Sequence, residues 1–227
     1  RNLRAASGWN GTTYPSSATR AAAPFAILDT VYLAKQLILS ANPSAALPDL
    51  DFYWSASNRT NDSPFCPDDG NIGTSFYFSD PSNQTNDECS TPRPLPAGIY
   101  ILGDYASGAG DTDEFDAHVI AHEFGHYFED RFSRSDSLGG EHGPTNRLDP
   151  RVAFGEGWGN AYAAMSLNDP RYRDSRDGIS SDFGFNLDSD GTNQGWFSEA
   201  SVGELLWDFY DDNNTSPEAG DGTSLGF

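Results

Sequence analysis

One short stretch of the sequence has residue types and spacing suited to binding a metal ion and activating water. Residues 122–126 read His-Glu-Phe-Gly-His, so His122 and His126 stand four positions apart. In a helix, positions i and i+4 lie on one face about one turn apart, so both imidazoles can reach one Zn²⁺. Glu123 follows the first histidine directly and can accept a proton from a metal-bound water. The stretch therefore predicts two zinc ligands, His122 and His126, and a general base, Glu123.

A catalytic zinc site takes a third protein ligand and keeps a fourth position for water. The sequence has no third histidine at the spacing that three-histidine sites use. A glutamate on a second helix is the other source, and Glu156 lies 30 residues after His126, between two glycines. A carboxylate buried among its aromatic neighbours needs a positive partner, and a zinc ion is one. We therefore predict Glu156 as the third ligand. Asn160, one turn later, is either a hydrogen-bond acceptor for a zinc histidine or a surface or capping residue.

Two further histidines and several tyrosines could assist this chemistry. His118 lies one turn before the motif, and we expect it beside the site or on the surface rather than among the ligands. His142 lies in a glycine-containing loop, and we interpret it as an ordinary loop histidine, with proton donation as the alternative. Peptide hydrolysis also requires a group that stabilises the oxyanion. Tyr210, Tyr162, Tyr105 and His142 have suitable chemistry.

The charge balance excludes some partners and suggests an ion. The chain has 34 acidic and 13 basic residues and a formal net charge of -21, so nucleic acid and anionic membranes are not expected partners. Solubility alone would explain this surface, but clustered aspartates also suit calcium. Residues 188–199 partly imitate a calcium-binding loop, with Gly191 at the fourth rather than the sixth place. The stretch is either an ordinary turn or a structural calcium site.

Two cysteines, Cys66 and Cys89, lie in loop-like sequence. A single disulfide fits a secreted, extracellular protein, and two free thiols are the alternative. No apolar run reaches the length that spans a membrane.

Hydrophobic periodicity and turn residues predict the elements that position these groups. Helices are expected over residues 21–41, 113–132, 151–167 and 198–210, and strands over 50–54, 74–78 and 98–103. Residues 111–114 read Asp-Thr-Asp-Glu, which suits an N-cap and an acidic first turn. Residues 133–150 and 170–197 are expected to be loops. The order of elements indicates an α+β protein. Residues 1–132 would form an α+β subdomain, and residues 133–227 a mainly helical, loop-rich one.

Three segments resemble the gluzincin clan of zinc metallopeptidases. Residues 118–126 resemble the active-site helix of thermolysin-like and fungalysin-like enzymes. Residues 155–158, Gly-Glu-Gly-Trp, resemble the Asn-Glu-Gly box of aminopeptidase-type members, and residues 202–210 resemble a late helix of fungalysin-like proteins. The resemblance covers roughly residues 98–210. It implies a zincin-like fold, with a small mixed sheet, backing and active-site helices, and a mainly helical lower half.

The resemblance also implies residue roles. His122, His126 and Glu156 would bind zinc, Glu123 would polarise the water, and Tyr210 would stabilise the oxyanion. An edge strand near residues 99–103, with Tyr100, Ile101 and Gly103, would hold an extended substrate by backbone pairing. The sequence departs from the resembled pattern in four ways: Gly155 replaces an Asn, Asn160 replaces an Asp, His118 replaces a calcium-binding Asp, and the spacing from His126 to Glu156 is longer.

These observations predict a secreted, monomeric zinc metallopeptidase, and specifically an endopeptidase, that acts on peptide or protein substrates. Two alternatives stay open. One is a non-catalytic binding or adhesion module that keeps a structural zinc ion, although such a site needs no general base. The other is a zinc hydrolase of a non-peptide substrate.

Overall fold

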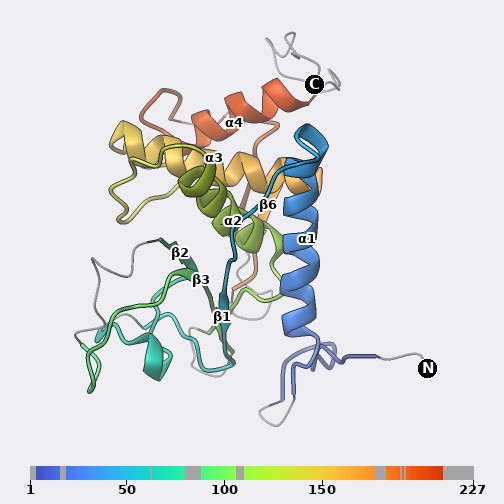
Figure 1. The fold of residues 1–227 in the computed structure, drawn as a ribbon, viewed down its shortest axis with the longest axis vertical. Coiled ribbons are helices and arrows are strands. Elements are labelled where there is room, and N and C mark those ends of the chain that lie inside the picture. The colour runs from blue at the N-terminus through green and yellow to red at the C-terminus, as the bar shows by residue number, and fades with distance from the viewer. Residues whose placement is uncertain are drawn as a thin grey trace. The chain divides into compact units, whose positions relative to one another are not determined.

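The computed structural model describes residues 4–15, 19–61, 63–79, 88–105, 110–176, 183–189, 191 and 193–211 (Figure 1). Helices and short strands both contribute to the fold. In chain order the elements are α1 (Ala23–Ala41), β1 (Phe52–Trp54), the 3-10 turn η1 (Pro67–Asp69), β2 (Phe76–Phe78), β3 (Gly98–Ile101), β4 (Gly103–Asp104), β5 (Asp111–Thr112), α2 (Ala117–Phe132), α3 (Pro150–Leu167), β6 (Arg171–Asp174), β7 (Phe183–Asn186) and α4 (Glu199–Tyr210).

The chain separates into two compact units. The first contains Arg1–Tyr32, Leu47–Ile120 and Arg173–Phe183, and the second contains Leu33–Ala46, Ala121–Tyr172 and Gly184–Phe227. This division differs from the predicted boundary at residue 132, because most of α2 packs with the helices that follow it. Within the described part of the chain, no helix has the length and apolarity needed to cross a membrane.

A three-stranded sheet organises the first unit, with the order β1-β3-β2. β3 pairs in parallel with β1 and antiparallel with β2, so Tyr53 and Phe76 both lie opposite Tyr100. The ring of Tyr100 stacks on both neighbours, with centroids 4.6 Å from Tyr53 and 4.8 Å from Phe76. These cross-strand pairs stabilise the sheet, and Tyr100 also joins the apolar cluster with Ile72, Leu95 and Leu102.

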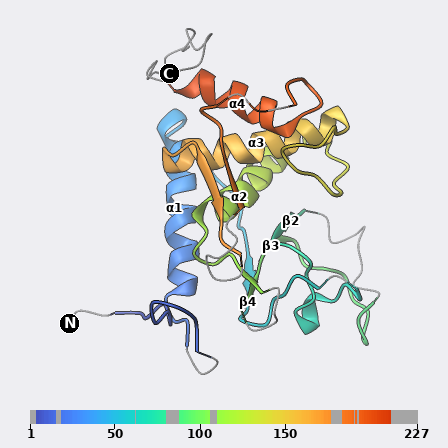
Figure 2. The same cartoon turned by 180° about the vertical axis from the view of Figure 1, so that it is seen from behind.

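The expectation of an edge strand near residues 99–103 is wrong. β3 is the central strand, and all four of its residues are buried. Gly103 belongs instead to β4, which is labelled in Figure 2 and pairs with β5, with Gly103 opposite Thr112. The carbonyl of Ile101 accepts from Asn58, and that of Gly103 accepts from Arg20. Substrate binding was assigned to Tyr100, Ile101 and Gly103 because an edge strand has unpaired backbone groups. These residues are paired within the fold, so that assignment has no basis.

Residues 111–114 do not cap a helix as predicted. Asp111 and Thr112 form β5, and α2 begins only at Ala117 with no acidic residue in its first turn. Glu114 is fully buried, and it accepts hydrogen bonds from the Arg20 guanidinium and from Trp54 Nε1, the latter at 3.2 Å. These acidic residues therefore belong to the core of the first unit. Asp111 pairs with β4, and Glu114 forms an ion pair with Arg20, so neither caps α2.

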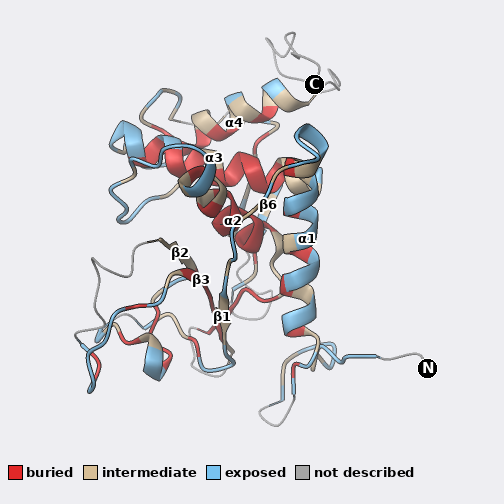
Figure 3. Cartoon of the chain, in the orientation of Figure 1, coloured by how far each residue is buried: buried red, intermediate tan, exposed pale blue. Residues whose placement is uncertain are grey.

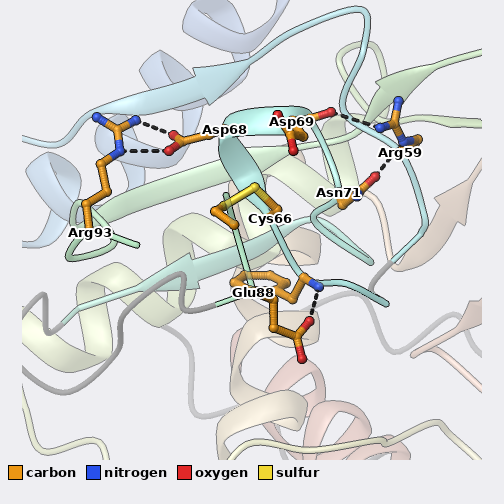
Figure 4. Close-up of a disulfide and its surroundings, with 9 residues drawn as sticks. Arg59, Cys66, Asp68, Asp69, Asn71, Glu88 and Arg93 are labelled. Atoms are coloured by element: carbon orange, nitrogen blue, oxygen red, sulfur yellow. Dashed lines mark hydrogen bonds and ion pairs between the residues drawn. A yellow bond between two sulfur atoms is a disulfide. The ribbon is translucent and has the colours of Figure 1, made fainter. Parts of the chain in front are cut away.

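A disulfide joins Cys66 and Cys89, which confirms the predicted pairing (Figure 4). Cys66 precedes η1, so the bridge ties this turn to a segment 23 residues away. Salt bridges and hydrogen bonds around the turn include Arg93 Nε donating to Asp68 Oδ2 at 2.8 Å (Figure 4). By the chain-entropy estimate, a loop of this size makes the disulfide worth about 3 kcal/mol of stability.

Helices α3 and α4 dominate the second unit, close to the predicted ranges. Asp149 caps α3 by accepting from the backbone N–H of Arg151 at 3.0 Å, Pro150 begins the helix, and Asn168 ends it in the left-handed conformation. Figure 3 shows that buried residues are concentrated along α2 and α3. Gly157 lets α4 approach α3 closely, because a Cβ there would lie 2.6 Å from Val202 Cβ. The strands β6 and β7 form a two-stranded sheet in a region predicted to be a loop.

Candidate metal centre

Three predicted ligand residues converge in the second unit. His122 and His126 come from α2 and Glu156 comes from α3. The two imidazole Nε2 atoms lie 2.9 Å apart, and Glu156 Oε2 lies 3.2 Å from His122 Nε2 and 3.3 Å from His126 Nε2. Four-coordinate zinc with ligands at 2.0–2.1 Å places neighbouring ligand atoms roughly 3.3 Å apart. The spacing of the trio therefore fits a zinc ion.

Hydrogen bonding at His122 shows which of its nitrogens could bind the ion. Asn160 Oδ1 lies 2.9 Å from His122 Nδ1, and an amide oxygen can only accept, so Nδ1 carries the hydrogen. Nε2 then presents a lone pair toward the carboxylate of Glu156 and the ring of His126. Electron-rich atoms that face one another in this way fit a shared cation. Asn160 is buried, which favours its predicted acceptor role over a surface role.

Gly159 allows the His122 ring to lie directly against the backbone of α3. A Cβ at this position would lie 2.8 Å from both Cε1 and Nε2 of the ring. Our sequence interpretation considered only the glycines beside Glu156, Gly155 and Gly157, and missed Gly159. The alternation of Gly155, Gly157 and Gly159 inside a helix was the available signal, because glycine weakens helices and is retained where something must come close.

The environment of Glu156 favours its ionised form. Burial by itself raises the pKa of this carboxyl, but the adjacent side chains of His122 and His126 hold the pKa well below its ordinary value. A cation at the trio would act in the same direction, because an adjacent opposite charge favours the carboxylate.

The interpretation of His142 as an ordinary loop histidine is wrong. Its Nδ1 lies 2.9 Å from Oε2 of Glu199, the first residue of α4, and its Nε2 lies 3.4 Å from Oε2 of Glu156. Burial lowers the pKa of His142, but the hydrogen bond to Glu199 and the charges of Glu156, Glu199 and Glu123 raise it to about 9. The negative charge of Glu123 therefore contributes to the raised pKa of His142, so the predicted base belongs to the same site.

The predicted oxyanion residue, Tyr210, lies elsewhere in the second unit. It packs against the apolar cluster of Ala164, Leu187 and Trp207, with its ring 5.6 Å from that of Trp207. At 1.5 Å per residue, Tyr210 lies roughly 16 Å along α4 from Glu199. The prediction that Tyr210 stabilises the oxyanion is therefore wrong, because the last turn of α4 packs against the apolar core.

The remaining tyrosine candidates also have other roles. The Tyr162 hydroxyl is buried and donates to the carbonyl of Ala34 at 2.7 Å. Tyr105 belongs to the first unit, where its ring packs edge-to-face on Trp9 and Tyr14. The side chain that the structure brings to the trio is instead His142.

The calcium-loop prediction over residues 188–199 includes Asp190 and Thr192, which lie outside the described residues. Its last predicted ligand, Glu199, is engaged by His142, as the 2.9 Å hydrogen bond shows. Glu199 is therefore part of the histidine site rather than the twelfth ligand of such a loop.

Comparison with known proteins gives one family. Residues 98–224, more than half of the chain, match the family described as the Mycolysin C-terminal domain. The matched range contains all the residues of the candidate metal centre. No curated protein and no solved structure matches the chain significantly. The family match supports a relationship to metallopeptidases. The chain therefore belongs to the family of the Mycolysin C-terminal domain.

Proposed function

We propose that this chain is a secreted zinc metallopeptidase with a zincin-like fold. The observation that carries the proposal is the convergence of His122, His126 and Glu156 on one point, with Glu123 and His142 beside them. A structural zinc site requires ligands only. A base and a third histidine, His142, next to the trio favour catalysis over a purely structural role.

The residues divide the chemistry of peptide hydrolysis among them. Zinc, when bound, polarises a carbonyl group and makes water more acidic. Glu123 accepts the proton of the attacking water and passes it to the leaving amine. Glu199 is nearly fully buried and fixes the His142 ring through Nδ1, so the opposite nitrogen faces the site. His142 donates a hydrogen bond from Nε2 to the oxygen on which negative charge develops.

The disulfide supports action outside the cell, and the net charge of -21 argues against nucleic acid and anionic membranes as partners. We propose an endopeptidase that works as a monomer and has no nucleic-acid or membrane partner. These assignments rest on composition and on the family relationship.

Metal analysis combined with peptide digestion tests the function. We expect one zinc ion per chain and cleavage of an unstructured peptide library. A zinc chelator should abolish the cleavage, and added zinc should restore it. A panel of esters without amide bonds is measured in parallel. Zinc binding without any hydrolysis would indicate the non-catalytic module, and hydrolysis confined to esters would indicate a non-peptide hydrolase.

Replacing His142 separates the proposed oxyanion donor from the tyrosine predicted earlier. We expect His142→Phe to lower kcat by about 10²–10³-fold, because it removes a hydrogen bond that strengthens in the transition state. The zinc content should remain near that of the parent chain. Tyr210→Phe is the control, and it should leave kcat unchanged. The reverse pattern, with activity lost only in Tyr210→Phe, would contradict the assignment.

A further inference from the structure

A second group of carboxylates gathers in the first unit. Asp111 lies in β5, Asp113 follows it, and Asp174 ends β6. One carboxylate oxygen from each of the three lies within 4.8 Å of the others. All three residues are at least nine-tenths buried, with exposed fractions of 8%, 3% and 7%. Backbone pairing between Asp111 and Arg176 and the bond from Asp113 N–H to the Leu102 carbonyl hold these segments in place.

Asp113 provides an independent sign that the cluster binds something. Its Oδ2 accepts a hydrogen bond from the Ser75 hydroxyl, and that hydroxyl in turn accepts from the backbone N–H of Leu102 at 2.9 Å. This chain of bonds fixes the carboxylate. The other oxygen, Oδ1, is buried and has no hydrogen-bond partner within the described residues. A buried carboxylate oxygen without a hydrogen-bond partner is costly, so its presence here points to a positively charged ligand.

The excess of negative charge around Asp113 also favours a bound cation. Carboxylate oxygens of Asp111, Asp113 and Asp174 lie within 4.8 Å of one another, so the negative charges repel one another when no cation is bound. Asp116 accepts from the N–H and hydroxyl of Ser175, yet burial raises its pKa to about 7. Arg176 lies 2.9 Å from Asp174 and 3.7 Å from Asp111, but it is half exposed. Its single charge can neutralise only one of these carboxylates.

We propose that Asp111, Asp113 and Asp174 bind a hard divalent cation of the Ca²⁺ class. The donors are carboxylate oxygens, which calcium prefers, whereas zinc sites use histidine and cysteine more often. The site is distinct from the histidine trio in its donor chemistry and from the calcium loop predicted over residues 188–199. The ion links β5 and the chain that enters α2 to the end of β6. Its role is to stabilise the first unit, and it does not depend on peptidase activity.

Calcium binding to the 227-residue chain tests this site. The protein is stripped of metals on a chelating resin, reloaded with one equivalent of zinc, and titrated with CaCl₂ by calorimetry, with MgCl₂ in a parallel series. We expect one Ca²⁺ per chain and weaker binding of Mg²⁺. Thermal melts at a calcium concentration of about 100 times Kd should show a Tm higher by roughly 5–10 °C. Failure of the parent chain to bind calcium would overturn the proposal.

Substitutions assign the bound ion to these carboxylates. Asp113→Asn keeps the size of the side chain and removes its charge, so we expect at least a tenfold loss of calcium affinity and no calcium-dependent rise in Tm. Its calcium-free Tm should not fall, because a buried charge has been removed. Asp29→Asn, on an exposed position of α1, is the matched control and should bind calcium like the parent.

Two further variants make the result decisive. Asp174→Asn should also lose the calcium response, and it replaces Asp113→Asn if that variant does not fold. Asp188→Asn changes the loop that the sequence suggested, and it should retain the response. A calcium effect that survives in both Asp113→Asn and Asp174→Asn, or that disappears in Asp188→Asn, rejects the site. Zinc content and peptide cleavage are recorded separately, so a failed peptidase proposal leaves this test intact.

Discussion

The Glu123→Gln variant is expected to bind zinc like the parent chain and to lose peptide hydrolysis by about 10²–10⁴-fold. Glutamine keeps the shape of the side chain but cannot accept the proton that the attacking water must lose. The proposed ligand trio of His122, His126 and Glu156 is unchanged, so we expect the zinc content to stay at one ion per chain. Steady-state cleavage of a labelled peptide and metal analysis of the same sample measure the two effects.

Glu141→Gln is the matched control for this experiment. Glu141 precedes His142 in the chain, and its position is exposed. The control makes the same chemical change without touching the proposed base, and it should retain the parent kcat. Full activity in Glu123→Gln, with zinc bound, would reject the mechanism. Loss of zinc together with activity would instead show that Glu123 supports the metal site.

Gly159→Ala is expected to weaken zinc binding by about 100-fold or more. The new methyl group would lie 2.8 Å from two ring atoms of His122, which is closer than real carbon contacts allow. The ring must therefore move, and this breaks its 2.9 Å hydrogen bond to Asn160. Loss of an outer-shell partner alone costs 10–100-fold in metal affinity, and displacement of the ligand itself adds to this. Competition with a zinc-binding dye measures the Kd.

Gly155→Ala provides the comparison within the same helix. A Cβ at position 155 would first meet Ser137 Cβ at 3.4 Å, which is an ordinary contact. This variant should keep the parent zinc affinity, and its Tm should rise because alanine favours a helix by up to about 1 kcal/mol over glycine. Equal zinc affinities in the Gly155 and Gly159 variants would show that the close approach at His122 is unimportant.

Features that depend on neighbouring residues were largely predictable from the sequence. The ranges of α1, α3 and α4 follow from apolar periodicity and from the flanking turn residues, such as Asn168 at the end of α3. The spacing of His122 and His126 needs only one helix. Glu156 could be selected because a carboxylate in that apolar, glycine-rich setting is unusual.

Features that depend on distant pairing could not be predicted in this way. The central position of β3 follows from pairing with two strands, and nothing in the segment itself distinguishes a central strand from an edge strand. His142 and Glu199 are 57 residues apart and meet only in the folded second unit. Asp174 lies far along the chain from Asp111 and Asp113, so the sequence did not show that the three would meet. Asp111 and Asp113 were therefore assigned to a helix cap. The zincin-like fold and the monomeric state remain predictions.

The glycines of α3 also bear on when the metal centre can assemble. Gly155, Gly157 and Gly159 lie within one short stretch of the helix, and each costs about 1 kcal/mol of helix stability relative to alanine. This stretch is therefore a poor helix on its own and becomes ordered through packing. The carboxylate of Glu156 reaches the histidines only when that packing is complete. A half-folded copy in which α3 is not yet packed would lack the Glu156 ligand, so the proposed peptidase would have no complete zinc site until this helix has folded.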